Sequence, residues 1–148
     1  MTLWRAACAE DVPAVVALLA DDDLGAKRET GTPATDLAAF AAMQAEGNNH
    51  LIVGAQAGRI VATYQITFIS GLSLAASRRA LISSVRVAAD LRSQGLGAAL
   101  MADAEARARA AGCSLLQLTT NKSRARAHAF YEQLGFTPSH IGYKRELH

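Results

Sequence analysis

The residues best suited to chemistry lie around two glycines in the middle of the chain. Gly95 and Gly97 follow the apolar, β-branched stretch 81–87 and precede a helix-forming run that ends near Ala111. Glycines at a strand-to-helix turn let the backbone approach a ligand and adopt positive φ. The first N–H groups of a helix attract anions, above all phosphate. Because Arg92 adds a positive charge just before the turn, the segment predicts a pyrophosphate site.

Two common phosphate motifs do not fit this spacing. A dinucleotide fingerprint needs a third glycine where Leu100 stands. A Walker A loop needs glycine, lysine and a hydroxyl residue in succession, but Gly97 is followed by two alanines. The pattern that remains is Arg92-x-x-Gly95-x-Gly97. A plain strand-to-helix turn with two glycines is the alternative interpretation.

This pattern resembles the acyl-CoA signature of the GNAT family of N-acetyltransferases, R/Q-x-x-G-x-G/A. A second segment, from Asn121 to Phe136, resembles the family's closing motif, N-x-x-A-x-x-F/L-Y-x-x-x-G-F, and matches its latter part from Ala127 onward. The resemblance covers essentially the whole chain and is strongest from Val85 to Phe136. Two motifs at the family separation are more specific than either one alone.

The resemblance implies that acetyl-CoA is the co-substrate and an amine the acceptor, with no metal. The pantetheine arm would lie between the strands 81–87 and 115–120, where backbone groups would bind it and one N–H would hold the thioester oxygen. Asn121 would meet the pantetheine or the acceptor. Lys122, Arg124 and Arg126 could reach the phosphates, and exposed surface bases are the alternative interpretation. The residues expected to bind acetyl-CoA are Val85, Arg86, Val87, Arg92, Ser93, Gln94, Gly95, Leu96, Gly97, Ala98, Asn121, Arg126 and Tyr131.

Tyr131 matches the position of the family's general acid. Transfer of acetyl from sulfur to nitrogen releases a thiolate, to which a phenol can donate a proton. The alternative interpretation is an aromatic ring packed beside Phe130 and Phe136.

The expected general base is harder to identify. Many relatives place a glutamate where Ser83 stands in this chain, and a serine hydroxyl is a poor base. Ser83 or Ser84 could order a water that relays the proton. Otherwise Glu46 or His128 serves as the base, or the acceptor amine is already partly neutral.

The elements that must position these residues follow the order of the family fold. This is an α/β (α+β) fold with a mixed, mostly antiparallel sheet flanked by about four helices. We expect helices capped by Glu10 or Asp11 and by Thr35 or Asp36, then helices from Gly97 and from Ala127. Leu37 and Phe40 should face inward, and Ala57-Gly58 should form a hairpin turn. Gly25, Gly31 and Pro33 should break the chain in the loop 24–34. In the helix from Gly97, the inward stripe should comprise Leu96, Leu100, Met101, Ala104 and Ala108. The expected strands are 2–8, 50–55, 59–70, 81–87, 114–120, 136–139 and 141–147.

Length and composition restrict the remaining possibilities. The 148 residues predict one domain spanning 1–148. A formal net charge of +2, without basic stripes, argues against nucleic acid, and no apolar run predicts a membrane span. The distant Cys8 and Cys113 fit neither a metal site nor a disulfide framework, and together with the lack of a signal peptide they indicate the cytoplasm. Family habit implies a homodimer.

The identity of the acceptor is left open at this stage. The run Asp21–Asp23 could attract a small cationic amine or an amino-acid-like acceptor, and a solvated acidic loop is the alternative. A protein lysine or N-terminus is the second candidate acceptor, and a catalytically weak acetyl-CoA-binding module is a further alternative. The expected acceptor pocket comprises the loop 24–34, Tyr64, Phe68 and the segment 141–143.

Overall fold

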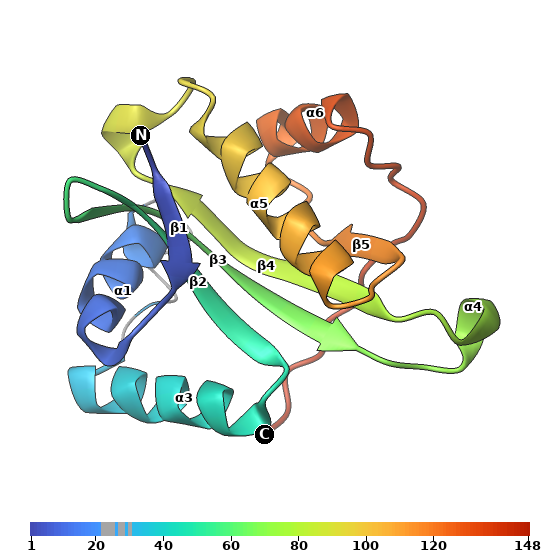
Figure 1. Ribbon diagram of the computed structural model, residues 1–148, viewed down its shortest axis with the longest axis horizontal. Helices are drawn as coiled ribbons and strands as arrows, with labels where there is room; N and C mark the ends of the chain where they lie inside the picture. Colours follow the sequence, from blue (N-terminus) through green and yellow to red (C-terminus); the bar gives the residue numbers. More distant parts are fainter. Residues whose placement is uncertain (22–25, 27–28, 30) are drawn as a thin grey trace. The chain divides into compact units, whose positions relative to one another are not determined.

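The computed structural model describes residues 1–21, 26, 29 and 31–148, and the chain divides into two compact units, Met1–Gln117 and Leu118–His148. Most of the acidic run and of the loop after it lies outside the described residues. The strands are β1 (Leu3–Ala6), β2 (Asn49–Gln56), β3 (Arg59–Ile69), β4 (Arg79–Val87) and β5 (Leu115–Leu118). The helices are α1 (Val12–Ala20), α3 (Pro33–Glu46), the single turn α4 (Ser73–Ala76), α5 (Leu96–Ala110) and, in the second unit, α6 (Ala125–Gln133) (Figure 1).

The five strands form one sheet in the order β1-β2-β3-β4-β5 (Figure 1). The first four pair antiparallel. Because β4, α5 and β5 form a strand–helix–strand crossover, β5 runs parallel to β4. The predicted α/β class and mixed, mostly antiparallel sheet are therefore confirmed, whereas the single domain spanning 1–148 stays a prediction.

The two faces of the sheet are covered by different helices of the first unit. On one face, the buried Tyr64 of β3 bonds Asp103 of α5. On the other face, Arg5 of β1 bonds Asp11, which directly precedes α1. Alternate residues of a strand point to opposite faces, so each side chain of β3 and β4 can be assigned to the α5 face or to the α1 face.

Helix α5 follows the predicted pattern closely. It begins one residue before the expected start, and its inward residues recur at helical spacing. The helix ends where Gly112 adopts φ +80°, as expected for a glycine just after a helix. The buried residues of the predicted stripe are Leu96, Leu100, Met101, Ala104 and Ala108.

Helix α3 starts earlier than the sequence indicates. Thr32 is its N-cap, because its side chain accepts a hydrogen bond from the Thr35 backbone N–H at 3.2 Å, and Pro33 occupies the first turn. Proline lacks an N–H that this position leaves unpaired anyway, so the expected break at Pro33 was wrong. Phe40 is buried as predicted, but Leu37 is 45% exposed and does not face inward.

The predicted pair of C-terminal strands is wrong. Residues 136–148, all of which the structure describes, form no strand. Ile141, Tyr143 and Leu147 alternate as strand residues do, yet they are 77%, 90% and 92% exposed. Alternation indicates which face a strand would bury, but a strand also needs a partner for its backbone groups.

In the part of the chain that the structure describes, no helix has both the length and the apolar character needed to cross a bilayer.

Candidate functional site

The turn before α5 presents unpaired backbone N–H groups. Gly95 is the N-cap with φ +81°, a left-handed conformation that glycine adopts without penalty. The Ala99 N–H makes the bond back to the Gly95 carbonyl at 3.1 Å. The N–H groups of the three preceding residues, Leu96 to Ala98, therefore have no partner within the helix. Among the described residues, no side chain caps this end and no acidic residue lies in the first turn, so its positive dipole is available to an anion.

The side chains of Arg92 and Gln94, which lead into this turn, donate to nearby backbone carbonyl groups. Arg92 Nε donates to the Val87 carbonyl at 3.3 Å, and Arg92 Nη2 lies 3.9 Å from Asp21 Oδ2. Gln94 Nε2 is 3.4 Å from the Asp90 carbonyl oxygen. The structure therefore brings the predicted residues from Arg92 to Ala98 together into one turn.

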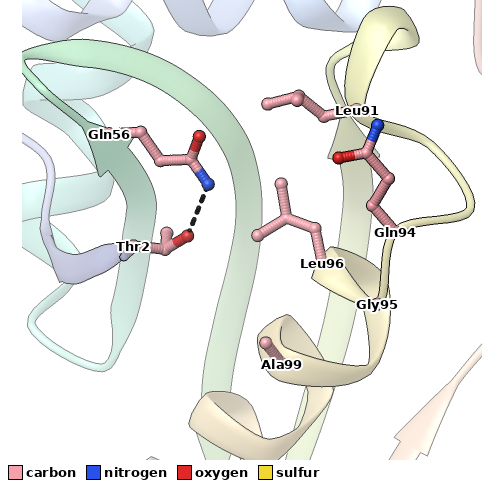
Figure 2. Close-up of a pocket in the computed structure, with 7 residues that line it drawn as sticks. All are labelled: Thr2, Gln56, Leu91, Gln94, Gly95, Leu96 and Ala99. Atoms are coloured by element: carbon pink, nitrogen blue, oxygen red, sulfur yellow. Dashed lines mark hydrogen bonds between the residues drawn. The ribbon is translucent and has the colours of Figure 1, made fainter.

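A hollow of about 230 Å³ lies beside this turn (Figure 2). Gln94 and Leu96 line it from the turn, and Thr2 and Gln56 line it from the other side, where Gln56 Nε2 donates to Thr2 Oγ1 at 2.9 Å. Small-molecule pockets usually measure about 300–1,000 Å³. None of the described residues that line this smaller hollow belongs to β4, so it flanks the helix start and does not reach Ser83.

Strand β4 contains a β-bulge that the sequence did not indicate. Gln65 pairs with Ser83, but Thr63 pairs with Arg86, so β4 has one more residue than β3 in this interval. Ser84 has φ +54°, a conformation that is uncommon for residues other than glycine. The extra residue shifts the alternation, and Ser83 and Arg86 consequently lie on the same α1 face although they are three positions apart.

The bulge is followed by backbone groups that point away from β3. Ala88 N–H donates to Val61 of β3 at 2.8 Å, and backbone groups alternate in direction along a strand. The backbone N–H and C=O groups of Arg86 therefore face β3, whereas the backbone groups of Val85 and Val87 face the β5 side. Arg86 Nη1 donates to the Val85 carbonyl at 2.9 Å. The N–H groups of Val85 and Val87 are thus directed away from β3, where a ligand could meet them, whereas the carbonyl groups of these two residues already accept hydrogen bonds from arginine side chains. Binding of acetyl-CoA by Val85, Arg86 and Val87 stays a prediction.

A set of polar side chains lies next to Ser83 on the α1 face. Gln65 stands opposite Ser83 in the neighbouring strand. Its Nε2 donates to Asn49 Oδ1 at 2.7 Å, and Asn49 Nδ2 donates to Glu46 Oε2 at 2.9 Å. Because the Gln65 amide nitrogen is engaged in this way, its Oε1 is the atom left to accept a hydrogen bond. Sequence analysis missed this cluster because its members come from α3, β2 and β3.

Two residues of the expected acceptor pocket lie on the opposite face. Tyr64 and Phe68 occupy the even positions of β3, whereas Gln65 occupies an odd one. Tyr64 is fully buried, and its hydroxyl donates to Asp103 at 2.5 Å. Burial first and this hydrogen bond second raise the pKa of the Tyr64 phenol above its usual range. Both residues therefore lie on the α5 face and not on the face of Ser83, and the composition of the acceptor pocket stays a prediction.

The second unit holds the remaining predicted residues. Tyr131 lies on α6 and makes edge contacts with Phe130 and Phe136, with ring centroids 5.2 and 5.9 Å away. These contacts fix the ring, and the role of the hydroxyl stays a prediction. His128 Nε2 lies 3.0 Å from the Asn121 carbonyl, so that nitrogen donates to the loop and does not act as a base.

The segment before α6 is a polar turn that places cations at a helix start. Asn121 Oδ1 accepts from the Ser123 N–H at 2.9 Å and from the Ser123 hydroxyl at 2.7 Å. Exposed Lys122, Arg124 and Arg126 flank the first turn of α6. Cations are unfavourable at the positive end of a helix dipole, so a bound anion would relieve their repulsion.

The Cys8 thiol and the metal-binding residue types of the described part of the chain can be examined for a reactive centre. Hydrogen bonds with Glu10 and then Asp11 raise the pKa of the Cys8 thiol, which disfavours the nucleophilic thiolate. Within the described ranges, no three or more histidine, cysteine or acidic residues gather as metal ligands would.

Three comparisons with known proteins bear on this site. The sequence profile of the acetyltransferase (GNAT) family matches residues 14–136. A 66-residue segment is 39% identical to the aminoalkylphosphonate N-acetyltransferase of Salmonella typhimurium, and this match covers 45% of the chain and 43% of that protein.

Two solved structures resemble the chain over nearly its whole length. A transcriptional regulator from Bacillus halodurans C-125 has a TM-score of 0.95 and 41% identity, covering 99% of this chain and 100% of that one. A protein from Agrobacterium tumefaciens str. C58, provisionally assigned as an acetyltransferase, has a TM-score of 0.84 and 28% identity, covering 98% and 99%.

Proposed function

The chain belongs to the acetyltransferase (GNAT) family, and from this premise we propose that it transfers acetyl from acetyl-CoA to the primary amine of a small acceptor. The amine attacks the thioester directly, and no covalent enzyme intermediate is needed. The observation that carries this proposal is the uncapped start of α5, which follows the bulged strand β4 after a short connection.

The co-substrate fits the residues present. The N–H groups of Leu96, Gly97 and Ala98 would hold the pyrophosphate, with Arg92 as the nearby charge. The N–H groups of Val85 and Val87 would bind the pantetheine arm and the thioester oxygen. In the second unit, Lys122, Arg124 and Arg126 would accept a further phosphate. Acetyl-CoA supplies an activated acyl group, and these residues orient it.

The amine would bind beside Ser83. Ser83 Oγ and Gln65 Oε1 can each accept a hydrogen bond from it, which directs the nitrogen lone pair toward the thioester. Among the described residues of this cluster, the carboxylate of Glu46 reaches Gln65 only through the Asn49 amide. A primary amide is a poor proton relay, so the cluster positions the amine and does not deprotonate it. The fraction of acceptor that is already neutral then limits the rate.

Tyr131 is proposed as the acid that protonates the departing thiolate. A phenol can perform this step, and its ring is held by two aromatic neighbours in the same unit. Support for a small acceptor comes from the Salmonella relative, whose name specifies an aminoalkyl compound. The cytoplasmic location and the homodimer implied by composition and family habit are further proposals, and size-exclusion chromatography with light scattering tests the second.

The testing experiment measures thiol release from acetyl-CoA with small amines, amino acids, polyamines and lysine peptides between mildly acidic and alkaline pH. Release that depends on a small amine and rises steadily with pH is expected, because the acceptor must lose its own proton. Activity restricted to peptides would instead indicate a protein acceptor. Binding of acetyl-CoA without release to any acceptor would indicate a binding module.

A further inference from the structure

We infer that the acceptor carries an anionic group, a phosphonate or carboxylate, and that Arg79 on β4 binds it. This inference rests on the proposed function and adds the chemical class of the acceptor. It follows from three features of Arg79: its missing partners, its face of the sheet and its distance from Ser83.

Arg79 has a half-buried side chain without a partner. It makes no hydrogen bond and no ion pair with the described residues, and its Nε is shielded from solvent without an acceptor. Buried polar groups in folded proteins are nearly always hydrogen-bonded, and an exception calls for an explanation. A guanidinium is also the side chain best matched to a phosphonate or carboxylate, because it can donate two parallel hydrogen bonds.

The neighbouring Arg78 has side-chain partners within the protein, in contrast to Arg79. Arg78 also has a shielded Nε, but its Nη1 donates to Ser70 Oγ at 2.8 Å and its guanidinium lies over the Phe68 ring, 5.7 Å from the centroid. Arg78 thus packs on the α5 face with Phe68. Arg79, the next residue, projects from the opposite face, where no described residue pairs with it.

That face is the one proposed to hold the amine. Arg79 pairs with Ile69, and Ser83 pairs with Gln65, both odd positions of β3. The bulge begins only after Ser83, so Arg79, Leu81 and Ser83 share the α1 face without interruption. One face of β4 therefore offers a hydrogen-bonding end at Ser83 and a cationic end at Arg79.

The spacing of the two ends suits a short bifunctional molecule. Four residues of a strand span about 13 Å between Cα atoms, and a side chain as long as arginine can shorten the gap to Ser83 when it leans along the strand. We expect acceptors with two or three carbons between the amine and the acid to be used better than the one-carbon homologue. The aminoalkylphosphonate acceptor in the name of the Salmonella relative has this composition.

The test compares acceptors and variants in the full-length protein. Aminomethyl-, 2-aminoethyl- and 3-aminopropylphosphonate, the matching amino acids and neutral amines of equal length serve as acceptors, with thiol release as the readout. Arg79→Met should lower kcat/KM for the anionic acceptors by about 10- to 100-fold, the value of a charge-assisted hydrogen bond. It should leave the neutral amines within about threefold, a change worth less than 1 kcal/mol.

Arg78→Met is the matched control, because it removes the arginine that directly precedes β4 and packs on the other face of the sheet. It should not change the preference for anionic acceptors. Arg79→Lys keeps the positive charge but not the pair of parallel hydrogen-bond donors. It should therefore retain part of the preference that Arg79→Met loses. Thermal unfolding of each variant verifies that the protein folds.

Several outcomes would overturn the inference while leaving the proposed function intact. These are equal use of neutral and anionic amines by the unaltered enzyme, or an equal loss for both classes in Arg79→Met. If no amine is acetylated, the proposed function fails, and calorimetric binding of 2-aminoethylphosphonate to the CoA-loaded protein decides the inference separately. Binding that Arg79→Met abolishes and Arg78→Met preserves would support it, and binding that is absent or unaffected by Arg79→Met would overturn it.

Discussion

The hydroxyl of Tyr64 on β3 donates a 2.5 Å hydrogen bond to Oδ2 of Asp103 on α5. Arg107 Nε donates to the same carboxylate oxygen at 2.8 Å, and its Nη2 reaches the Trp4 carbonyl at 3.4 Å. This network joins α5 to β3 and β1. The helix whose first turn forms the proposed phosphate site is therefore anchored to the sheet through its middle.

Tyr64→Phe should lower the free energy of unfolding by about 1–2 kcal/mol, because it removes one hydrogen bond but leaves Asp103 paired with Arg107. The raised pKa of the Tyr64 phenol means that the unfolded chain loses its proton first. The hydrogen bond's stabilisation is complete below about pH 10 and declines above it. Urea unfolding at neutral and alkaline pH checks both points. Tyr143→Phe, at a residue 90% exposed, should change neither, and an equal effect there would contradict the assignment.

Gly95→Ala should weaken acetyl-CoA binding at least tenfold and also lower stability. A Cβ at this position would meet no atom within 4 Å, so the cost comes from φ +81°, about 1–2 kcal/mol for an L residue, and from distortion of the N–H groups that follow. Equilibrium binding of CoA measures the first effect.

Gly58 supplies a close control for Gly95. It has the same φ of +81° and equally open space, but it lies in the hairpin turn between β2 and β3. Gly58→Ala should lose similar stability and keep its CoA affinity. If both variants lost affinity alike, the phosphate site at α5 would have to be abandoned.

Tyr131→Phe should reduce kcat about 10²- to 10⁴-fold, as expected for loss of a general acid, with little change in the affinity for acetyl-CoA. The substitution retains the ring contacts with Phe130 and Phe136. Pre-steady-state thiol release and equilibrium binding separate the two quantities. Phe136→Leu loosens the same cluster but keeps the hydroxyl, so an equal fall in kcat there would assign the effect to packing.

Asp11→Ala should destabilise the protein by about 1.5–3 kcal/mol at neutral pH, because the carboxylate accepts hydrogen bonds from Arg5 and from the Cys8 N–H. The Arg5 guanidinium, and less strongly the Cys8 backbone, hold the pKa of Asp11 well below its usual range despite partial burial. This stabilisation is present above about pH 4 and is lost as the pH falls further. Acid unfolding should therefore be less steep in the variant, and an unchanged slope would contradict this account.

Much of the fold could be predicted from local pattern. The apolar spacing along α5 identified its buried face, and Ala57-Gly58 identified the hairpin turn, because only the left-handed region closes such a turn. Asp11 was expected to cap α1 and does occupy the N-cap position. Its carboxylate makes no capping hydrogen bond to α1 and instead accepts from Arg5 and Cys8. The reason is that β1 places the Arg5 guanidinium next to it.

The acceptor side could not be predicted in the same way. Ser84 carries the bulge without any glycine to mark it, and the bulge decides which side chains share a face with Ser83. Gln65 and Asn49 come together through strand register, which composition does not determine. The turn before α5 was predictable because all its residues are contiguous and its geometry demands glycine.

The bulge at Ser84 also determines which changes β4 can accept. If Ser84 were deleted, the two halves of the strand would return to a common alternation, and one half would have to rotate by one position. Either Arg79 and Ser83 would turn into the layer of Tyr64, or Arg86 would. Both rearrangements place a cation among apolar side chains, which folding does not tolerate without a partner. Point substitutions along β4 can therefore change the proposed acceptor preference without changing the fold. Insertion or deletion of one residue would instead exchange the polar and the buried faces of part of the strand.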